Sequence, residues 1–268
     1  MVSDADPLEP YYDWRIKAMS RLAADVPAAY PGGPSHKAGA PVFLTTSVRD
    51  DRGIPIGFVT PNPVSLALHT AIVSAHEAVR LRRTIAFQDT ATPWGGGKDV
   101  VIENLPHLYD FFERCMIAVT FSVQALDTLC NFAFSYHVKG TVPVKMNKKT
   151  KHLNLQQLQG SNISVKMKIG SILPKVLSIQ SIESGNDTAW KNYLELERIR
   201  NITVHLDSSK ESPRDIDTKS LFYEFFSTEA TVYPRWALDV MDYYKGNMKN
   251  SAFVDIARKE LEGSSPTR

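Results

Sequence analysis

Three residues near the end of one helical segment carry side chains that could do chemistry together. Arg200, Asn201 and His205 stand close together in the stretch Glu195-Leu-Glu-Arg-Ile-Arg-Asn-Ile-Thr-Val-His205. An imidazole can exchange a proton near neutral pH, and a guanidinium is a fixed cation whose fork matches phosphate oxygens. Arginine and histidine at this spacing are common by chance. Asn201 and the helical context are therefore what make the segment a candidate site.

Helical geometry shows why one copy of this segment is an incomplete phosphate site. At about 100° per residue, Arg200 and His205 lie roughly 140° apart around the helix, with Asn201 and Glu197 inside that arc. The arc is too broad for one Arg–His pair to hold a single phosphate, so we expect a homodimer in which a two-fold axis brings two copies to one cleft. The opposite side of the helix carries apolar residues: Ile199, Ile202 and Leu206.

The pattern Arg200-Asn201-x-x-x-His205, on a late helix that follows a long apolar helix, resembles the HEPN superfamily, whose shared motif is Arg, four to six residues, then His. The resemblance implies an all-α, HEPN-like helical bundle and, in nuclease members, metal-independent cleavage of RNA at a composite dimer site. His205 would then exchange a proton with the attacking 2′-hydroxyl or the leaving 5′-oxygen, while Arg200 stabilises charge on the phosphoryl oxygens. Asn201 would orient the histidine or the phosphate. The expected products are a 2′,3′-cyclic phosphate and a 5′-hydroxyl, formed without a metal or another cofactor.

The family also bears on biological role and on the choice of arginine. HEPN nucleases serve in defence, toxin or RNA-processing systems, so the resemblance implies an antiviral or growth-inhibiting role with an unidentified antitoxin or defence-system partner. Arg198 also satisfies the looser family spacing and is an alternative to Arg200. One family variant carries a Tyr where this chain has Asp207, so we do not expect that variant's pairing with a nucleotidyltransferase antidote.

Three function classes stay open for this segment. The first is an endoribonuclease that acts on single-stranded RNA through Arg200 and His205. The second is a non-catalytic HEPN-like module that dimerises and binds RNA or a nucleotide. The third is a helical interaction protein in which Arg, Asn and His lie on a solvated or salt-bridged helix face.

A basic segment follows the long apolar helix. Residues 139–175 contain eight lysines and no Asp or Glu. Neutralising phosphates releases counterions, so such a segment could follow an RNA backbone without reading its sequence. We expect RNA contacts from the lysine-rich stretch and from one nearby arginine: Lys145, Lys148, Lys149, Lys151 and Arg198. The other interpretation is a solvated loop. Because no aromatic residue is interleaved with the lysines, base stacking is not expected there.

Other polar groups favour simpler interpretations. Asp127, in the long apolar helix, could support Arg200 or make a buried polar contact. The stretch Ala91–Asp99 fails as a phosphate loop, because the first glycine is missing and Asp follows Lys98. His69 and His76 lie two turns apart without a third ligand at useful spacing, so no metal site is expected.

Periodicity and caps predict the elements that position these residues. Apolar residues recur at helical spacing over Pro63–Arg83, where Asn62 would cap and Pro63 would begin the helix, and over Leu105–His137. A third helix is expected over Asp187–Leu206, with Asp187 or Thr188 as its cap, and a fourth over Tyr11–Val26. Shorter helices are expected over Thr218–Glu229, Pro234–Tyr244 and Ser251–Glu262. The runs Pro-Val-Phe-Leu-Thr-Thr-Ser-Val and Ile-Gly-Phe-Val-Thr predict a small hairpin.

These elements predict an all-α domain over 61–262, with a basic insertion at 139–186, an N-terminal extension over 1–60 and a disordered tail over 263–268. The chain is 268 residues long and can bury a sizeable core. Its formal net charge of +2 is too small to indicate a partner. Two cysteines within one apolar helix and an acidic N-terminus without a signal peptide favour the cytoplasm. The apolar stretch Cys115–Val138 contains Gln124, Asp127, Asn131 and His137, so we expect a core helix and no membrane contact.

Overall fold

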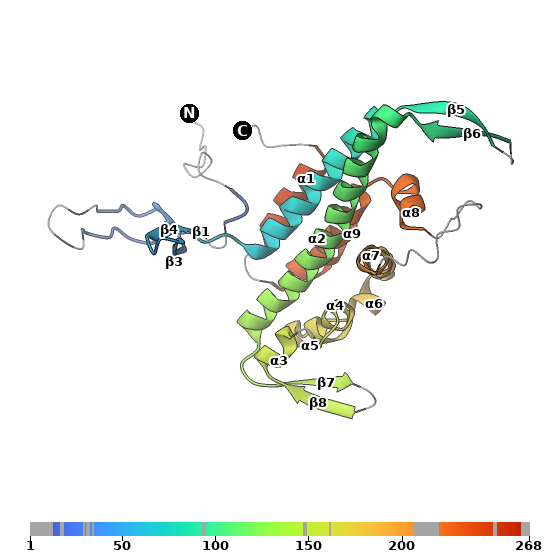
Figure 1. Ribbon diagram of the computed structural model, residues 1–268. Coiled ribbons are helices and arrows are strands. Elements are labelled where there is room, and N and C mark those ends of the chain that lie inside the picture. Colours follow the sequence, from blue (N-terminus) through green and yellow to red (C-terminus); the bar gives the residue numbers. More distant parts are fainter. Residues whose placement is uncertain are drawn as a thin grey trace, which may run out of the picture. The chain divides into compact units, whose positions relative to one another are not determined.

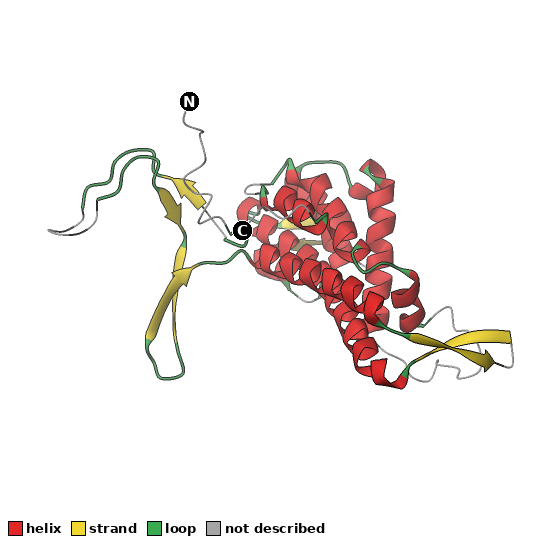
Figure 2. Cartoon of the chain, turned by 90° about the horizontal axis from the view of Figure 1, so that it is seen from above, coloured by secondary structure: helices red, strands yellow, loops and turns green. Residues whose placement is uncertain are grey.

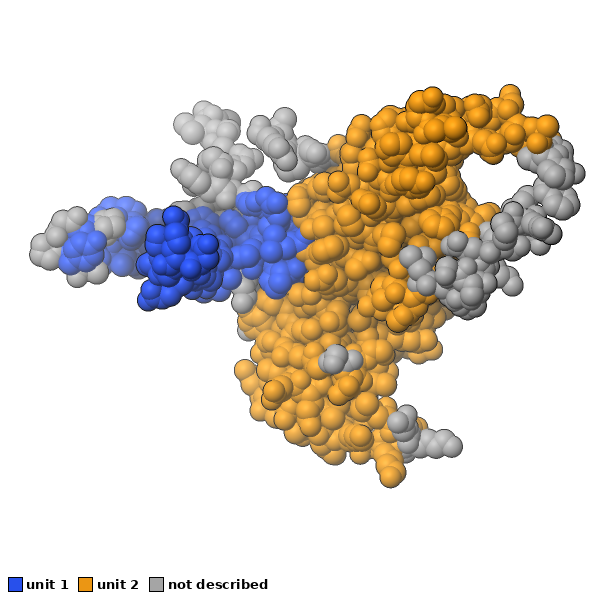
Figure 3. Space-filling view, viewed as in Figure 1, with its two compact units in different colours: residues 1–66 blue, residues 67–268 orange. Residues whose placement is uncertain are grey.

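The computed structural model of the protein describes residues 13–16, 19–28, 30, 33, 35–92, 95–146, 149–160, 162–205, 220–248 and 251–263. The chain divides into two compact units, Met1–Leu66 and Ala67–Arg268, which Figure 3 colours separately. The N-terminal extension expected over residues 1–60 belongs to the first unit. Of the expected tail, only Gly263 is among the described residues.

The described part of the first unit contains two two-stranded antiparallel sheets. Strand β1 (Met19–Arg21) pairs with β2 (Pro41–Phe43), and β3 (Thr45–Arg49) pairs with β4 (Pro55–Val59). The turn between β3 and β4 is held by Asp50, whose carboxylate accepts the N–H groups of Arg52 and Ile54 at 3.0 and 2.8 Å. Gly53 takes a φ of 80° there, which favours glycine. The small hairpin predicted from the two strand-forming runs is confirmed.

The helix predicted over Tyr11–Val26 is wrong over its described part. Met19–Arg21 is a strand, and Val26 exchanges backbone hydrogen bonds with His36 at 2.7 and 2.9 Å. Ile16 forms a further antiparallel bridge with Pro61. These partners lie far along the chain, so the local spacing of apolar residues could not reveal them. Pairing with distant residues overrides the weak helix propensity of this segment.

Two long helices form much as the sequence predicts, and the first of them begins within the last residues of the first unit. Helix α1 (Pro63–Thr84) begins at Pro63, and the Asn62 side chain accepts the N–H of Val64 at 3.0 Å. Helix α2 (Leu105–His137) has the predicted bounds and buries a nearly continuous face. The short turn η2 (Ile102–Asn104) precedes it. Local signals were sufficient here because an N-cap and a 3.6-residue period are both local.

The C-terminal helices complete the core around α2. Helix α7 (Asp187–Val204) and helix α9 (Val232–Lys245) pack against α2 and against each other, and α10 (Phe253–Leu261) packs on α9. Helix α8 (Leu221–Ser227) contacts α7. Figure 1 shows α2 running through the middle of this group. The cap of α7 is Asn186, one residue before the predicted Asp187, and its side chain accepts the N–H of Ala189.

The connection between α2 and α7 contains one hairpin and several short helical pieces. Strands β7 (Val142–Met146) and β8 (Lys149–Leu153) form the hairpin, and α3 (Leu155–Gln159) and α4 (Val165–Met167) follow it. A π-helical turn over Lys168–Ile172 then leads into α5 (Leu173–Leu177) and α6 (Ile182–Gly185).

The all-α prediction is wrong, and with it the expected HEPN-like bundle as a fold class. The described residues contain four two-stranded antiparallel sheets, so the architecture is mixed. Strands β5 (Phe87–Thr92) and β6 (Gly95–Val100) form a hairpin that the sequence pattern did not predict, and it projects from the helices in Figure 1 and Figure 2. Strand β6 contains Gly95, Gly96 and Gly97, and glycine is depleted in strands, so local propensity argues against this strand.

Helix α2 is a core helix by its burial. With the turn before it, Ile102–His137 is the one stretch in the described part of the chain that is long and apolar enough to cross a membrane, yet 56% of its apolar window is buried inside the protein. Its fully buried positions include Cys115, Val119, Leu126 and Phe134. Such packing is the usual environment of an all-round apolar helix in a globular domain.

Candidate functional site

Helix α7 carries the predicted catalytic residues at its C-terminal end, with Asn201 and His205 on its outer side and Arg200 beside the packed side. Its inner side is buried against the core through Ala189, Trp190, Tyr193, Leu196, Ile199 and Thr203. Asn201 and His205 are exposed, and Arg200 is half-buried at the edge of the inner side. Of the apolar residues expected to be buried, Ile199 is buried, Ile202 is half-buried, and Leu206 lies outside the described residues. The helix therefore separates a packed side from a polar one.

Asn201 forms hydrogen bonds with both other predicted residues, with the side chain of Arg200 and with the backbone of His205. Arg200 donates a hydrogen bond from Nη1 to the Asn201 side-chain oxygen at 3.2 Å. The backbone N–H of His205 donates to the Asn201 carbonyl at 3.0 Å, which is the last hydrogen bond of the helix. His205 itself is the C-cap, with φ −118° and ψ 53°. Its side chain therefore extends from the residue that ends α7 and not from a regular helical turn.

Arg200 and His205 are not brought together within one chain. No hydrogen bond joins their side chains in the described parts of the protein, and five residues of helix separate them by about 7.5 Å along the axis and roughly 140° around it. One copy of α7 therefore offers the cation and the imidazole in different directions. A single phosphate could contact both only if a second copy supplied one of them.

The two neighbouring arginines of α7 differ in their charge environment. Arg198 donates to Glu195 at 2.6 Å and to Glu224 of α8 at 2.5 Å. These carboxylates, Glu195 first, raise the pKa of the Arg198 guanidinium, and Arg198 in turn lowers the pKa of Glu195. Arg198 is thus matched by two carboxylates and joins α7 to α8. Arg200 has no carboxylate partner among the described residues. Its guanidinium donates instead to the neutral amide oxygen of Asn201.

The predicted RNA-contacting lysines lie on a hairpin and divide between its faces. Lys145 is on β7 opposite Thr150, whereas Lys149 and Lys151 are opposite Met146 and Val144. Because cross-strand partners share a face, Lys149 and Lys151 project on one side of the hairpin and Lys145 on the other. All three are exposed, and Lys148 lies outside the described residues.

One lysine of the basic segment is not available for RNA. Lys168, at the start of the π-helical turn, has only 2% of its side chain exposed. Its ammonium donates to Asp127 at 2.7 Å and to Asn131 at 2.9 Å. Asp127 therefore makes a polar contact with a buried lysine, which corresponds to one of the two roles predicted for it. Its contacts in the described part of the chain do not include Arg200, the other predicted partner.

Both cysteines are buried, and the two histidines of α1 have partners. Cys115 and Cys130 are free thiols inside the core, and burial raises the pKa of Cys115 to about 12 and that of Cys130 further. His69 lies 3.0 Å from Glu260, and His76 bonds the carbonyl of Leu261 at 3.0 Å. Within the described residues, no group of three His, Cys, Asp or Glu side chains could hold a metal ion.

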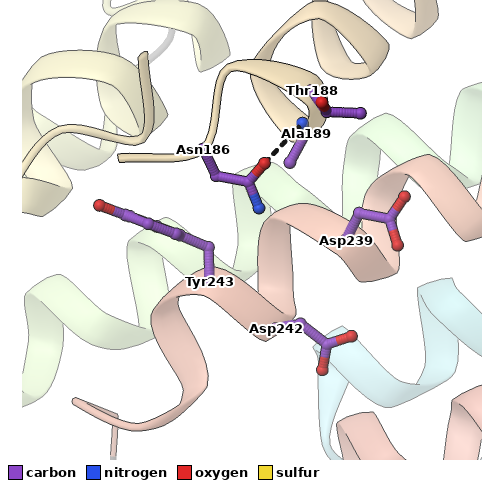
Figure 4. A pocket seen from close by; sticks show the side chains of 6 residues that line it. All are labelled: Asn186, Thr188, Ala189, Asp239, Asp242 and Tyr243. Carbon is purple, nitrogen blue, oxygen red and sulfur yellow. Dashed lines mark hydrogen bonds between the residues drawn. The ribbon is translucent and has the colours of Figure 1, made fainter. Parts of the chain in front are cut away.

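A surface cavity that sequence reasoning missed lies at the other end of α7. It measures about 370 Å³ and is lined by Asn186, Thr188, Ala189, Asp239, Asp242 and Tyr243 (Figure 4). Arg258 donates to Asp239 at 3.0 Å and also to Asp242, and Lys245 lies 2.9 Å from Asp242, so each carboxylate already has a cation beside it. Asn186 and Arg200 are about 20 Å apart along the helix, so this cavity is separate from the predicted catalytic residues. No sequence motif marks it.

Comparison with known proteins adds no relative. No family model, no curated protein and no solved structure matches this chain.

Proposed function

We propose that the protein is a metal-independent endoribonuclease that cleaves single-stranded RNA, with Arg200 of one copy and His205 of a second copy forming one site. The proposal is supported by the polar end of α7, where Asn201 and His205 are exposed and Arg200 is half-buried. The HEPN resemblance of these residues supplies the reaction class. The resemblance is limited to this motif, because the mixed architecture of the chain does not match the all-α fold of that family.

Each side chain has one role in this proposal. His205 takes the proton of the attacking 2′-hydroxyl or gives one to the leaving 5′-oxygen. Arg200 stabilises the negative charge that develops on the phosphoryl oxygens. Asn201 holds the guanidinium through its side-chain oxygen, so that the cation is positioned before RNA binds. Cleavage would leave a 2′,3′-cyclic phosphate and a 5′-hydroxyl.

The observation that carries the proposal is the contrast between Arg198 and Arg200. Arg198 is paired with Glu195 and Glu224, whereas the half-buried Arg200 is held by a neutral amide and has no carboxylate partner among the described residues. A guanidinium without a carboxylate, held near the surface, is well placed to bind a phosphate in fork geometry. For this reason Arg200, and not Arg198, is the arginine of the proposed site, and Arg198 is left out of the RNA contacts.

The β7–β8 hairpin supports RNA as the substrate. Lys149 and Lys151 are exposed on one face, and neither forms an ion pair in the described part of the chain. Two such charges on one face can follow a phosphate backbone, and their contribution to affinity falls as the salt concentration rises.

The test is cleavage of a labelled single-stranded RNA by purified protein in EDTA. We expect cleavage by the wild type and a loss of at least about 100-fold in the Arg200→Ala and His205→Ala variants, since each removes a group that acts in the transition state. Arg235→Ala and His107→Ala are matched controls, because both side chains are exposed and lie on other helices. Cleavage that persists unchanged in both site variants would refute the assignment.

A second function has one observation in its favour. In the described residues, the His205 imidazole has no hydrogen-bond partner that would orient it, which a general base usually needs. A non-catalytic dimerisation and RNA-binding module would tolerate this arrangement. If the wild type cleaves no RNA, but Arg200→Ala still weakens RNA binding in a fluorescence anisotropy titration, the binding module replaces the enzyme.

A further inference from the structure

A second surface cavity, of about 280 Å³, lies where the C-terminal end of α1, the N-terminal part of α2 and helix α8 meet (Figure 1). Its apolar lining comes from these helices and from the residue two positions before α9: Val79, Phe111, Phe225, Phe226 and Ala230. Phe111 and Phe225 are 2% and 1% exposed, and the rings of Phe111 and Phe226 lie 5.4 Å apart. Much of the lining is therefore made of closely packed aromatic rings.

Two arginines at the C-terminal end of α1 line the same cavity. The Arg82 guanidinium lies 4.6 Å from the centre of the Phe226 ring and 5.5 Å from that of Phe87 on β5. These cation–π contacts hold the guanidinium without the N–H groups being taken by a carboxylate. Arg83 is exposed, and neither arginine forms an ion pair in the ranges that the structure describes. The cavity thus combines aromatic walls with two available cations.

The charge of the lining matches a ligand with one negative group. Glu229 is the one carboxylate among the described lining residues, and it is exposed and accepts the Thr231 hydroxyl at 2.5 Å. Two guanidinium groups and one carboxylate leave a formal charge of +1. A nucleic-acid backbone carries a charge on every nucleotide, so it would bring further phosphates towards Glu229. A single carboxylate near Arg82 and Arg83 avoids that repulsion.

We propose that this cavity binds a small aromatic carboxylate, with its rings against the phenylalanines and its carboxylate on Arg82 and Arg83. Aromatic walls offer water few hydrogen bonds, so an apolar ring displaces that water favourably and gains ring–ring contacts. Guanidinium groups bind carboxylates through paired N–H groups, which fixes the orientation of the ligand. Sites for drug-sized ligands measure about 300–1,000 Å³, so a cavity of about 280 Å³ suits a ligand of one or two rings.

Calorimetric titration of the full-length protein with 2-naphthoate tests the ligand class. This probe has two fused rings and one carboxylate, and 2-naphthalenemethanol has the same rings without the charge. For a ligand of this size we expect a Kd of about 0.1–1 mM for 2-naphthoate. The neutral alcohol should bind at least about fivefold more weakly, since it lacks the charge-assisted hydrogen bonds. Equal affinity for the two probes, or tighter binding of uridine monophosphate than of 2-naphthoate, would overturn the inference.

Paired variants on one helix test the location. Val79→Phe adds a ring to the cavity lining and should raise the Kd for 2-naphthoate at least about tenfold, because the ring occupies the space of the ligand. Val73→Phe is the matched control, since Val73 lies on the same helix, is 48% exposed and does not line the cavity. Circular dichroism checks that both variants fold. Equal affinities of these two folded variants would show that 2-naphthoate binds elsewhere and would overturn the site.

A second pair of variants tests the charge. Arg83→Gln should raise the Kd at least about threefold, whereas Arg235→Gln, an exposed arginine outside the cavity, should leave it unchanged. An unchanged Kd in Arg83→Gln would contradict the predicted contact with Arg83. The inference does not rest on the proposed function, because no lining residue belongs to α7. Arg200→Ala should accordingly bind 2-naphthoate as the wild type does, even though it should cleave no RNA.

Discussion

The Lys168 ammonium is enclosed by the protein, while the carboxylate that balances it reaches water. The Lys168 side chain is 2% exposed and the Asp127 side chain 36% exposed. Removing the carboxylate leaves a buried charge supported only by Asn131, whereas removing the ammonium leaves a carboxylate that water can solvate. The two halves of this ion pair should therefore contribute unequally to stability.

We predict that Asp127→Ala lowers the free energy of unfolding by about 3 kcal/mol, and that Lys168→Met, which keeps the volume and removes the charge, lowers it by less than about 1.5 kcal/mol. Urea unfolding followed by circular dichroism measures both. Equal losses of unfolding free energy in the two variants would contradict the prediction, because the buried ammonium of Lys168 would then not account for the contribution of the ion pair to stability.

Arg198 supplies a prediction with a pH dependence. Arg198 lowers the pKa of Glu195, so this contact stabilises the folded protein above the ordinary glutamate pKa and is lost as the pH falls through the lowered value. Both side chains are more than a third exposed, so solvent screens the pair and the effect is small.

We expect Arg198→Ala to reduce the free energy of unfolding by about 0.5–1 kcal/mol at pH 7, with the difference from wild type shrinking below about pH 4. RNA cleavage should stay within about twofold of wild type at pH 7, since Arg198 is not in the proposed site. A larger loss of cleavage with unchanged stability would return Arg198 to the site.

The sequence could identify the types of these residues but not their partners. Glu224 lies 26 residues beyond Arg198, and Lys168 lies 41 residues beyond Asp127, so neither ion pair can be seen in helical spacing. The sequence therefore offers both Arg198 and Arg200, and only the contacts in the folded chain distinguish them. Spacing did predict correctly that Ile199 is buried while Asn201 and His205 are outside.

Among the elements, the π-helical turn over Lys168–Ile172 is held from several sides. Tyr244 donates to the carbonyl of Ile169, and Ser181 donates to the carbonyl of Gly170, each at 2.8 Å. Gly170 packs against Trp190 of α7 so closely that an added Cβ would lie 2.8 Å from the ring. The glycine is required here for space, since its backbone φ is not in the left-handed region.

Gly170→Ala should therefore lower the free energy of unfolding by about 1–3 kcal/mol, because the rigid indole cannot move aside without disturbing α7. Gly246→Ala is the matched control, since a Cβ added there would meet nothing within 4 Å and the backbone φ is −63°. Thermal unfolding of both variants distinguishes them. A Gly170→Ala protein as stable as Gly246→Ala would show that Trp190 is not a fixed neighbour.

Helices were predicted better than strands, for physical reasons. An amphipathic or apolar helix contains its hydrogen-bond partners and its caps within one segment, as α1 and α2 do. Strands β1 and β6 depend on partners outside their own residues, and β6 contains glycines that lower its propensity. The π-helical turn has no recognised sequence pattern, since tertiary contacts with Tyr244 and Ser181 satisfy its carbonyls.

At the scale of the molecule, the proposed site needs a second copy of the chain. Helix α7 presents Arg200 and His205 in different directions, so one copy does not bring both groups to a single phosphate. The formal net charge of +2 could not indicate this, because the argument does not depend on total charge.

The most direct test of the central claim is to mix two inactive variants. Arg200→Ala keeps His205, and His205→Ala keeps Arg200, so a mixed dimer regains one complete site if the pair is shared between copies. After the two proteins are mixed in equal amounts and allowed to exchange subunits, we predict RNA cleavage in EDTA at about a quarter of the wild-type rate, since half of the dimers are mixed and each has one of two sites. Cleavage by the mixture no greater than that of either variant alone, with subunit exchange verified by a fluorescent label, would contradict a site shared between two chains.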